Sequence, residues 1–419
     1  MKIKTKKLSY EKVMSLPRPK HRKPLKPSIF FRTLIRVISV FDLFAARFTF
    51  KKKNMEKAGK GPYLILMNHS SFIDLEIAYR IMYPKPMCIV STTDGLVGKA
   101  WLMRLIGCIP TQKFVTDMTL IRDIIYAIRE KKTSVLMYPE AGYSFDGTAT
   151  VLPKSLGGLV KRLGVPLVNI HTYGAFLYQP LYNCLKKRKV KVSAEAECLL
   201  TAEEIAEKSA EEIQSIIEKA FTFDNFAWQY ENKIEIKEKD RAVGLERILY
   251  KCASCGKEGE MHGEGTEIIC KACGKKYELT TLGKLSSEDG EKFDHIPDWY
   301  NWERECVRKE LLEGTYLLDT EVEIGMLVDH KALYMVGKGR LTHNSNGFKL
   351  TGCDGKLNYE QKPLSSYGLN SDYYWYEIGD VIGIGDRNCL YYCFPKKDGV
   401  VTKTRLAAEE LYKMAKENK

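Results

Sequence analysis

The run YLILMNHSSFID occupies residues 63–74 and sets the fold of the region around it. Its first five residues are all apolar, which is typical of a strand covered on both faces of a sheet. Asn68 and His69 then form a turn, and residues 75–82 have a helical pattern. An offset of five on one helix would separate two side chains by about 140°, so we expect His69 in the turn and Asp74 in the first helical turn. Asp74 could then hold one imidazole nitrogen while the other takes a proton from a hydroxyl.

Strands and helices continue to alternate beyond this run. Short apolar segments predict more strands, with helical periodicity between them: 88–90, 134–138 and 165–171 as strands and 120–130 as a helix. Ser209 and Glu212 have the spacing of a capping box, which predicts the start of another helix. The pattern indicates an α/β fold in which helices flank a sheet.

The length of 419 residues predicts two or three domains. We expect a basic tail at 1–27, an α/β domain at 28–238, a cysteine-rich segment at 239–300, and a connecting helix with a mainly β domain at 301–419. The β domain begins near residue 316, and a helix at 404–416 closes it.

The net charge of +13 is concentrated in residues 1–27, which hold ten basic residues against Glu11. Such a segment favours an anionic membrane surface or a nucleic acid, and a solvated, disordered tail is the alternative. The amino terminus has no apolar core followed by a cleavage site, so we expect a cytoplasmic protein. The eight cysteines outside 252–273 lie mostly in apolar segments, which fits reduced thiols.

Residues 29–50 have almost the length of a membrane span, but four charged side chains interrupt them. Each charge would be costly at the centre of a bilayer, so a transmembrane helix is not expected. On a helix the charges share one side and apolar residues cover the rest. We predict one amphipathic helix lying in the lipid interface, with packing on the protein's own core as the alternative.

Two cysteine pairs lie fourteen residues apart, each followed by a glycine. Two such knuckles can close a tetrahedral site with four thiolates and no open position for catalysis. We predict a zinc ribbon with one structural zinc; two disulfides or iron are the alternatives. The predicted ligands are Cys252, Cys255, Cys270 and Cys273.

Three further blocks follow the His69 run in order. A glycine turn leads to Lys113, the run YPEAGYS fills residues 138–144, and the proline-led strand VPLV begins at Val165. With the Asn-His-x4-Asp motif, these blocks resemble the glycerolipid acyltransferase family, best known for its lysophosphatidic acid acyltransferases. The resemblance covers roughly residues 30–238, and four ordered blocks make a chance agreement improbable.

The resemblance implies acyl transfer from a thioester, on acyl carrier protein or coenzyme A, to a hydroxyl of a lysophospholipid. It implies a peripheral enzyme on the cytoplasmic face of a membrane, without a catalytic cofactor. His69 would be the general base and Asp74 its orienter. The implied substrate-binding residues are Asn68, Lys113, Glu140, Gly142, Tyr143 and Ser144.

Two positions depart from the family pattern. Lys113 stands where the family has arginine, and Ala141 to Tyr143 replace the usual Gly-Thr-Arg. The bidentate grip of an arginine on phosphate is therefore absent. Another lysolipid, or the hydroxyl of a glycolipid, would suit a tyrosine-lined site.

The carboxyl-terminal β domain resembles a pleckstrin-homology or GRAM-like module, without a diagnostic motif. Two alternatives to an acyltransferase stay open at this point: a basic zinc-ribbon protein that binds nucleic acid, and a lipid-binding scaffold without activity. The four ordered blocks have no role in nucleic-acid binding, and the intact His69 and Asp74 favour an active enzyme. The oligomeric state is left open.

Overall fold

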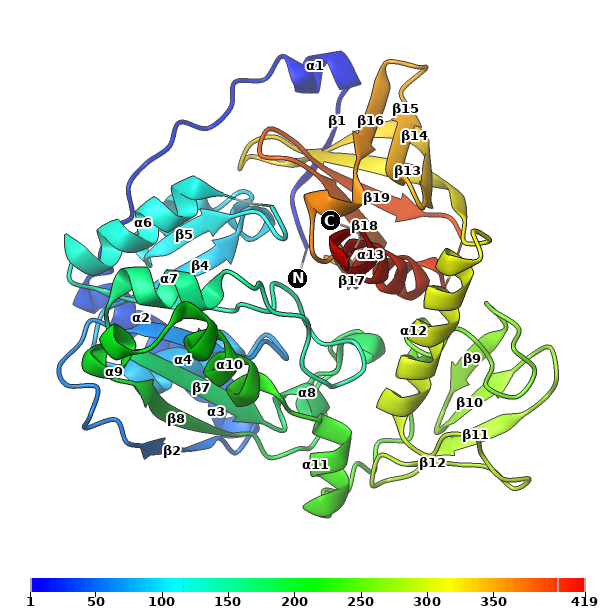
Figure 1. The fold of residues 1–419 in the computed structure, drawn as a ribbon, viewed down its shortest axis with the longest axis horizontal. Coiled ribbons are helices and arrows are strands. Elements are labelled where there is room, and N and C mark those ends of the chain that lie inside the picture. The colour runs from blue at the N-terminus through cyan, green and yellow to red at the C-terminus, as the bar shows by residue number, and fades with distance from the viewer. Residues whose placement is uncertain (1, 116, 398, 418–419) are drawn as a thin grey trace.

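The computed structural model describes residues 2–115, 117–397 and 399–417. Its α/β domain is built on a seven-stranded sheet in the order β2-β8-β7-β3-β6-β4-β5 (Figure 1). Neighbouring strands are parallel except β7 and β8, which are antiparallel. The strands are β2 (Thr49–Lys53), β3 (Leu64–Met67), β4 (Met87–Thr92), β5 (Cys108–Thr111), β6 (Ser134–Met137), β7 (Leu167–Tyr173) and β8 (Ser193–Leu200).

Strand β3 lies inside this sheet, and all four of its side chains are buried. Leu64 and Leu66 pack with residues of α6, α7 and α10, whereas Ile65 and Met67 pack with residues of α4. Alternate side chains of the apolar run therefore pack on opposite faces of one sheet. The predicted α/β fold with flanking helices is confirmed. The helices are α4 (Asp74–Met82), α5 (Ala100–Leu105), α6 (Met118–Arg129), α7 (Leu156–Leu163), α8 (Ala175–Tyr178), α9 (Ala202–Glu207), α10 (Ala210–Phe221) and α11 (Asn225–Glu231).

The single amphipathic helix predicted for residues 29–50 is wrong in extent. The segment forms α2 (Ile29–Ile38) and α3 (Val40–Ala45), which meet at Ser39, and its last residues enter the edge strand β2. The chain leaves the helix at Arg47, whose φ of 48° is left-handed, and the following residues pair with β8. Pairing with the sheet edge therefore overrides the helical pattern.

A four-stranded antiparallel ribbon follows the α/β domain and carries the paired cysteines. Helix α12 (Ile296–Leu312) then leads to a mainly β domain, which α13 (Val400–Glu417) closes. Residues 370–385 form two antiparallel strands, because the chain turns between them. The ribbon strands are β9 (Met261–Glu264), β10 (Glu267–Cys270), β11 (Lys276–Leu279) and β12 (Leu285–Ser286). The domain has β13 (Leu318–Leu327), β14 (Leu333–Asn344), β15 (Gly347–Gly352), β16 (Leu357–Gln361), β17 (Asn370–Trp375), β18 (Gly379–Gly385) and β19 (Leu390–Pro395).

The amino-terminal segment, predicted as a basic tail, crosses to the carboxyl-terminal domain. Its strand β1 (Thr5–Lys7) pairs in parallel with β14, and the short helix α1 (Tyr10–Met14) follows (Figure 1). The amino-terminal strand therefore belongs to the sheet of the carboxyl-terminal domain.

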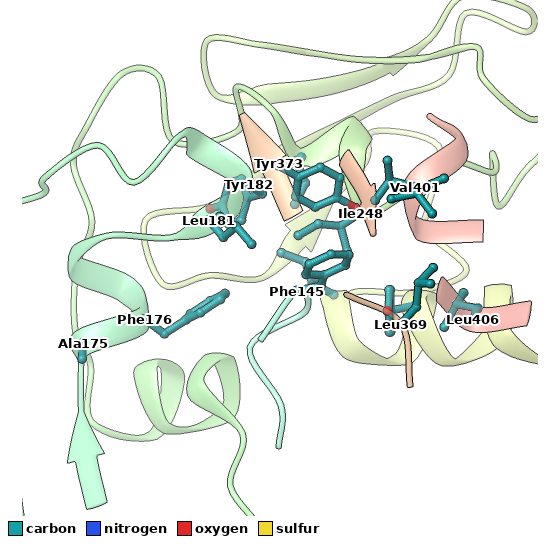
Figure 2. Close-up of a cluster of buried hydrophobic side chains, with 14 of the residues drawn as sticks. Phe145, Ala175, Phe176, Leu181, Tyr182, Ile248, Leu369, Tyr373, Val401 and Leu406 are labelled. Carbon is teal, nitrogen blue, oxygen red and sulfur yellow. The ribbon is translucent and has the colours of Figure 1, made fainter. Parts of the chain in front are cut away.

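The hydrophobic core runs without a break from the α/β domain into the carboxyl-terminal domain. Figure 2 shows Phe145 and Tyr182 of the first domain beside Tyr373 and Val401 of the second, with Ile248 between them. The rings of Phe145 and Tyr373 are 4.6 Å apart. This shared core fixes the β domain against the loop that follows β6.

Candidate functional site

His69 lies in the turn between β3 and α4, and Asp74 is the first residue of α4. The Asp74 carboxylate is fully buried, and its Oδ2 atom lies 3.1 Å from His69 Nδ1. The backbone N–H groups of Ser70 and Ser71 donate to the same oxygen at 2.7 and 2.9 Å. Three groups thus hold one carboxylate oxygen at a helix amino terminus, where negative charge is favoured. This is the arrangement that the five-residue offset predicts.

Two tyrosine rings enclose the His69 imidazole. The ring of Tyr138 stacks on it at 4.2 Å, and the ring of Tyr143 lies at 4.4 Å. The histidine side chain is still 25% exposed, and within the described residues no hydrogen bond is made to its Nε2 atom. Burial raises the pKa of both tyrosines well above its usual value, so their hydroxyls stay protonated. One imidazole nitrogen is therefore fixed and the other is open to a substrate.

The Glu140 side chain is hydrogen-bonded to the turn that holds His69. Its Oε2 atom accepts the backbone N–H of His69 at 2.8 Å, and Oε1 accepts that of Thr150 at 3.0 Å. The side chain is buried, which raises its pKa to about 7. The Glu140 side chain therefore ties the turn that holds His69 to the loop after β6. Asn68 ties the same turn to β7, because its amide oxygen accepts hydrogen bonds from the backbone N–H and the hydroxyl of Thr172.

The remaining predicted residues lie in two loops. The Ser144 hydroxyl donates to the Thr148 carbonyl at 2.6 Å and accepts the Gly147 N–H at 2.9 Å, so it closes a buried turn. Gly142 has open space where a Cβ would stand. Lys113 follows β5 and is half-buried, and within the described residues it makes no ion pair shorter than 4.0 Å. The structure thus brings His69, Asp74, Glu140 and Tyr143 together, while Asn68 and Ser144 brace the loops.

Tyr138 belongs to this site although the sequence argument gave it no role. It lies in the same run as Glu140, so its place in the motif was an available signal. Two further His–Asp pairs also escaped sequence reasoning. His21 lies 2.9 Å from Asp123, and His295 lies 2.8 Å from Asp224.

The four paired cysteines meet at the end of the ribbon. Their Sγ atoms all lie within 4.8 Å of one another, with 3.8 Å between Cys252 and Cys273 and 3.7 Å between Cys255 and Cys270. A disulfide needs a separation of about 2.05 Å, so none of these contacts is a bond. Thiolates around a tetrahedral zinc at about 2.3 Å would lie about 3.8 Å apart. The four sulfur atoms therefore fit one structural zinc ion.

Comparison with known proteins finds a family match for the segment that holds the His69 turn. Residues 47–172 match the Acyltransferase family, and this segment includes His69, Asp74, Lys113 and the loop after β6. The match agrees with the predicted acyltransferase over this segment of the chain.

Other comparisons are more distant. A similar solved structure is the 1-acyl-sn-glycerophosphate (LPA) acyltransferase PlsC from Thermotoga maritima, with 17% identity over 45% of this chain and 76% of that chain. The TM-score of 0.35 is low. No curated protein matches this chain. Among its described residues, no helix combines the length and the apolar character needed to cross a membrane.

Proposed function

We propose that this acyltransferase moves a fatty acyl group from a thioester to the hydroxyl of a lysophospholipid at a membrane surface. The observation that carries the proposal is the geometry of His69 inside the matched segment. Its Nδ1 atom is fixed by a buried carboxylate at 3.1 Å, and its Nε2 atom is open. This is what a general base for a hydroxyl requires.

The reaction follows from the two imidazole nitrogens. The Nδ1–H group of His69 donates a hydrogen bond to Asp74, which fixes the tautomer in which Nε2 carries a lone pair. Nε2 takes the proton of the acceptor hydroxyl as its oxygen attacks the thioester carbonyl. The tetrahedral intermediate then collapses, the C–S bond breaks, and the thiol leaves with the proton from Nε2. The products are an ester and the free thiol of coenzyme A or acyl carrier protein.

The exposed apolar residues of α2 and α3 support membrane attachment. Phe41 and Phe44 are 79% and 83% exposed, and Phe30 is 66% exposed. Helix α2 packs against α4, whose first residue is Asp74, and leaves these side chains in solvent. Aromatic side chains on a short amphipathic helix can enter a lipid interface, and the surplus of basic residues favours an anionic cytoplasmic leaflet. The lipid acceptor would then reach His69 from the membrane on which the enzyme lies.

The other parts of the chain fit supporting roles. One zinc ion bound by the four cysteines would stabilise the ribbon without taking part in the reaction. The family match and the fixed His69 pair favour an active enzyme over a nucleic-acid-binding protein or an inactive scaffold. The resemblance of the β domain to a pleckstrin-homology or GRAM-like module stays a prediction.

The test is an acyl-transfer assay with purified protein, oleoyl thioesters and a panel of lysolipids, read by mass spectrometry. Wild-type protein should acylate at least one lysolipid, and His69→Ala should lose that activity. The matched control is His21→Ala, which breaks the His21 to Asp123 pair away from the catalytic turn. Equal activity of wild type and His69→Ala would overturn the proposal.

A further inference from the structure

The carboxyl-terminal domain packs on the loops of the α/β domain that flank Lys113. The backbone N–H of Gly98 donates to the carbonyl of His330 at 2.8 Å. The rings of Phe114 and Tyr367 are 5.2 Å apart. Arg387 lies 3.6 Å from Asp117. The loops before and after β5 are therefore held by the β domain, although the matched acyltransferase segment contains no residue of that domain.

Strand β17 brings Asp372 between the two loops of the proposed acceptor site. Gly368, just before β17, lies against the ring of Phe114, the residue that follows Lys113. One residue after Asp372, the ring of Tyr373 packs on Phe145 (Figure 2). Phe145 is two residues beyond Tyr143, so both loops approach the same part of β17.

The charges of this region act on one another. Burial raises the pKa of Asp372 to about 6, and the nearby positive charge of Lys113 opposes the rise. The Asp372 charge in turn contributes to the raised pKa of Tyr143, whose ring lies 4.4 Å from that of His69. Together with the contacts of Gly368 with Phe114 and of Tyr373 with Phe145, these charge effects place Asp372 near the lysine and near the tyrosine that replaces the family's arginine.

The backbone of β17 is distorted where these side chains leave the sheet. Its pairing with β18 shifts register between Asp372 and Trp375. Tyr374 and Tyr376 both have φ of 48°, which is unusual for a tyrosine. A bulge of this kind re-aims side chains and is common beside active sites. Asp94 is buried, and its negative charge raises the pKa of both Tyr376 and Asp372, so it adds a second carboxylate near Asp372.

This combination of charges discriminates between head groups. A phosphate monoester carries close to two negative charges at pH 7, and it would meet the carboxylates of Asp372 and Asp94 beside Lys113. Arg405 is a second positive charge that acts on Asp372, but its guanidinium is paired with Glu409. A phosphodiester that ends in an ammonium group carries one charge of each sign. Its phosphate can pair with Lys113, while its ammonium group pairs with Asp372 and lies against the tyrosine rings.

We propose that Asp372 is a specificity-determining residue that binds the ammonium group of a zwitterionic lysophospholipid whose phosphate lies on Lys113. This inference rests on the proposed function, and it names the acceptor class for that same site. The β domain would thus complete the acceptor site that the acyltransferase domain begins.

The experiment compares wild type with Asp372→Asn in the acylation of lysophosphatidylcholine and of 1-acylglycerol-3-phosphate. We expect wild type to prefer lysophosphatidylcholine, and Asp372→Asn to lower the ratio of the two kcat/KM values by about tenfold or more, mainly through KM. Asp372→Glu should restore part of the preference. The matched control is Asp319→Asn, which removes a carboxylate of the same domain that pairs with Arg340.

A ratio unchanged in Asp372→Asn would overturn the inference while the proposed function stands, as would a wild-type preference for 1-acylglycerol-3-phosphate. Absence of any acylation by wild type would overturn the proposed function. In that case, equilibrium binding of short-chain lysophosphatidylcholine to the wild type and the variants tests the inference about Asp372. Weaker binding by Asp372→Asn than by Asp319→Asn supports it, and equal binding refutes it.

Discussion

His69 and His295 each pair with an aspartate in this molecule, but only His69 is placed to act as a base. The two pairs have similar distances, 3.1 Å to Asp74 and 2.8 Å to Asp224. The second nitrogen of His295, Nδ1, is buried without a hydrogen-bond partner, and that side chain is only 13% exposed. The His69 side chain is 25% exposed and leaves Nε2 open. Pairing with a carboxylate therefore does not by itself make a base, because the other nitrogen must also be open to a substrate.

The largest difference in acyl transfer is expected when the aspartate of each pair is changed to asparagine. Asp74→Asn is expected to lower kcat by about 10²–10⁴-fold, because the amide favours the wrong imidazole tautomer. Asp224→Asn should leave kcat close to that of wild type. Steady-state kinetics with a saturating lysolipid checks both, and similar losses in the two variants would contradict the comparison.

Glu140→Gln should have the next largest effect. One oxygen of Glu140 accepts the N–H of His69 and the other that of Thr150, so an amide NH₂ would face one of these donors. We expect the turn to shift and kcat to fall about 10–100-fold. Glu204→Gln, which changes a helix-capping carboxylate on α9, is the control. Unchanged kcat in Glu140→Gln would show that the turn does not depend on this bridge.

Loss of the metal site should affect stability more than catalysis. Cys270→Ser is expected to remove bound zinc and to lower the unfolding temperature of the ribbon, with acyl transfer reduced by less than about tenfold. Cys353→Ser, at a cysteine outside the cluster, is the control. Metal analysis and thermal unfolding measure these effects. Absence of zinc from freshly reduced wild-type protein would contradict the ribbon assignment.

The smallest effect on acyl transfer is expected from His295→Ala, which should cost about 1–3 kcal/mol of unfolding free energy. The hydrogen bond to Asp224 raises the pKa of His295 above 6.5. The folded state then binds the proton more tightly than the unfolded state, so this contribution is complete below pH 6.5 and lost as pH rises through the raised pKa. Denaturant unfolding from pH 6 to 9 should show the difference between wild type and His295→Ala shrinking. A difference that grows with pH would rule out this linkage.

The features that depend on nearby residues could be predicted from the sequence. His69 and Asp74 are five positions apart, and each cysteine pair closes within one knuckle. The capping box of Ser209 and Glu212 forms as expected. Such features need only local backbone geometry.

The features that depend on distant contacts could not be predicted. His295 and Asp224 are 71 residues apart, and no spacing rule links them. Asp372 lies in the proposed acceptor site because β17 packs on the loops that hold Phe114 and Phe145, far earlier in the chain. The early end of the helical segment before β2 follows from the pairing of β2 with β8, which the periodicity of residues 29–50 does not reveal.

The most direct test of the central claim is acyl transfer by His69→Ala and His295→Ala proteins at equal folded concentration. Both variants lose a histidine that pairs with an aspartate, so the comparison isolates the open imidazole nitrogen. The account predicts that His69→Ala loses at least about 10² in kcat while His295→Ala stays close to wild type. Equal kcat values in the two variants would contradict it.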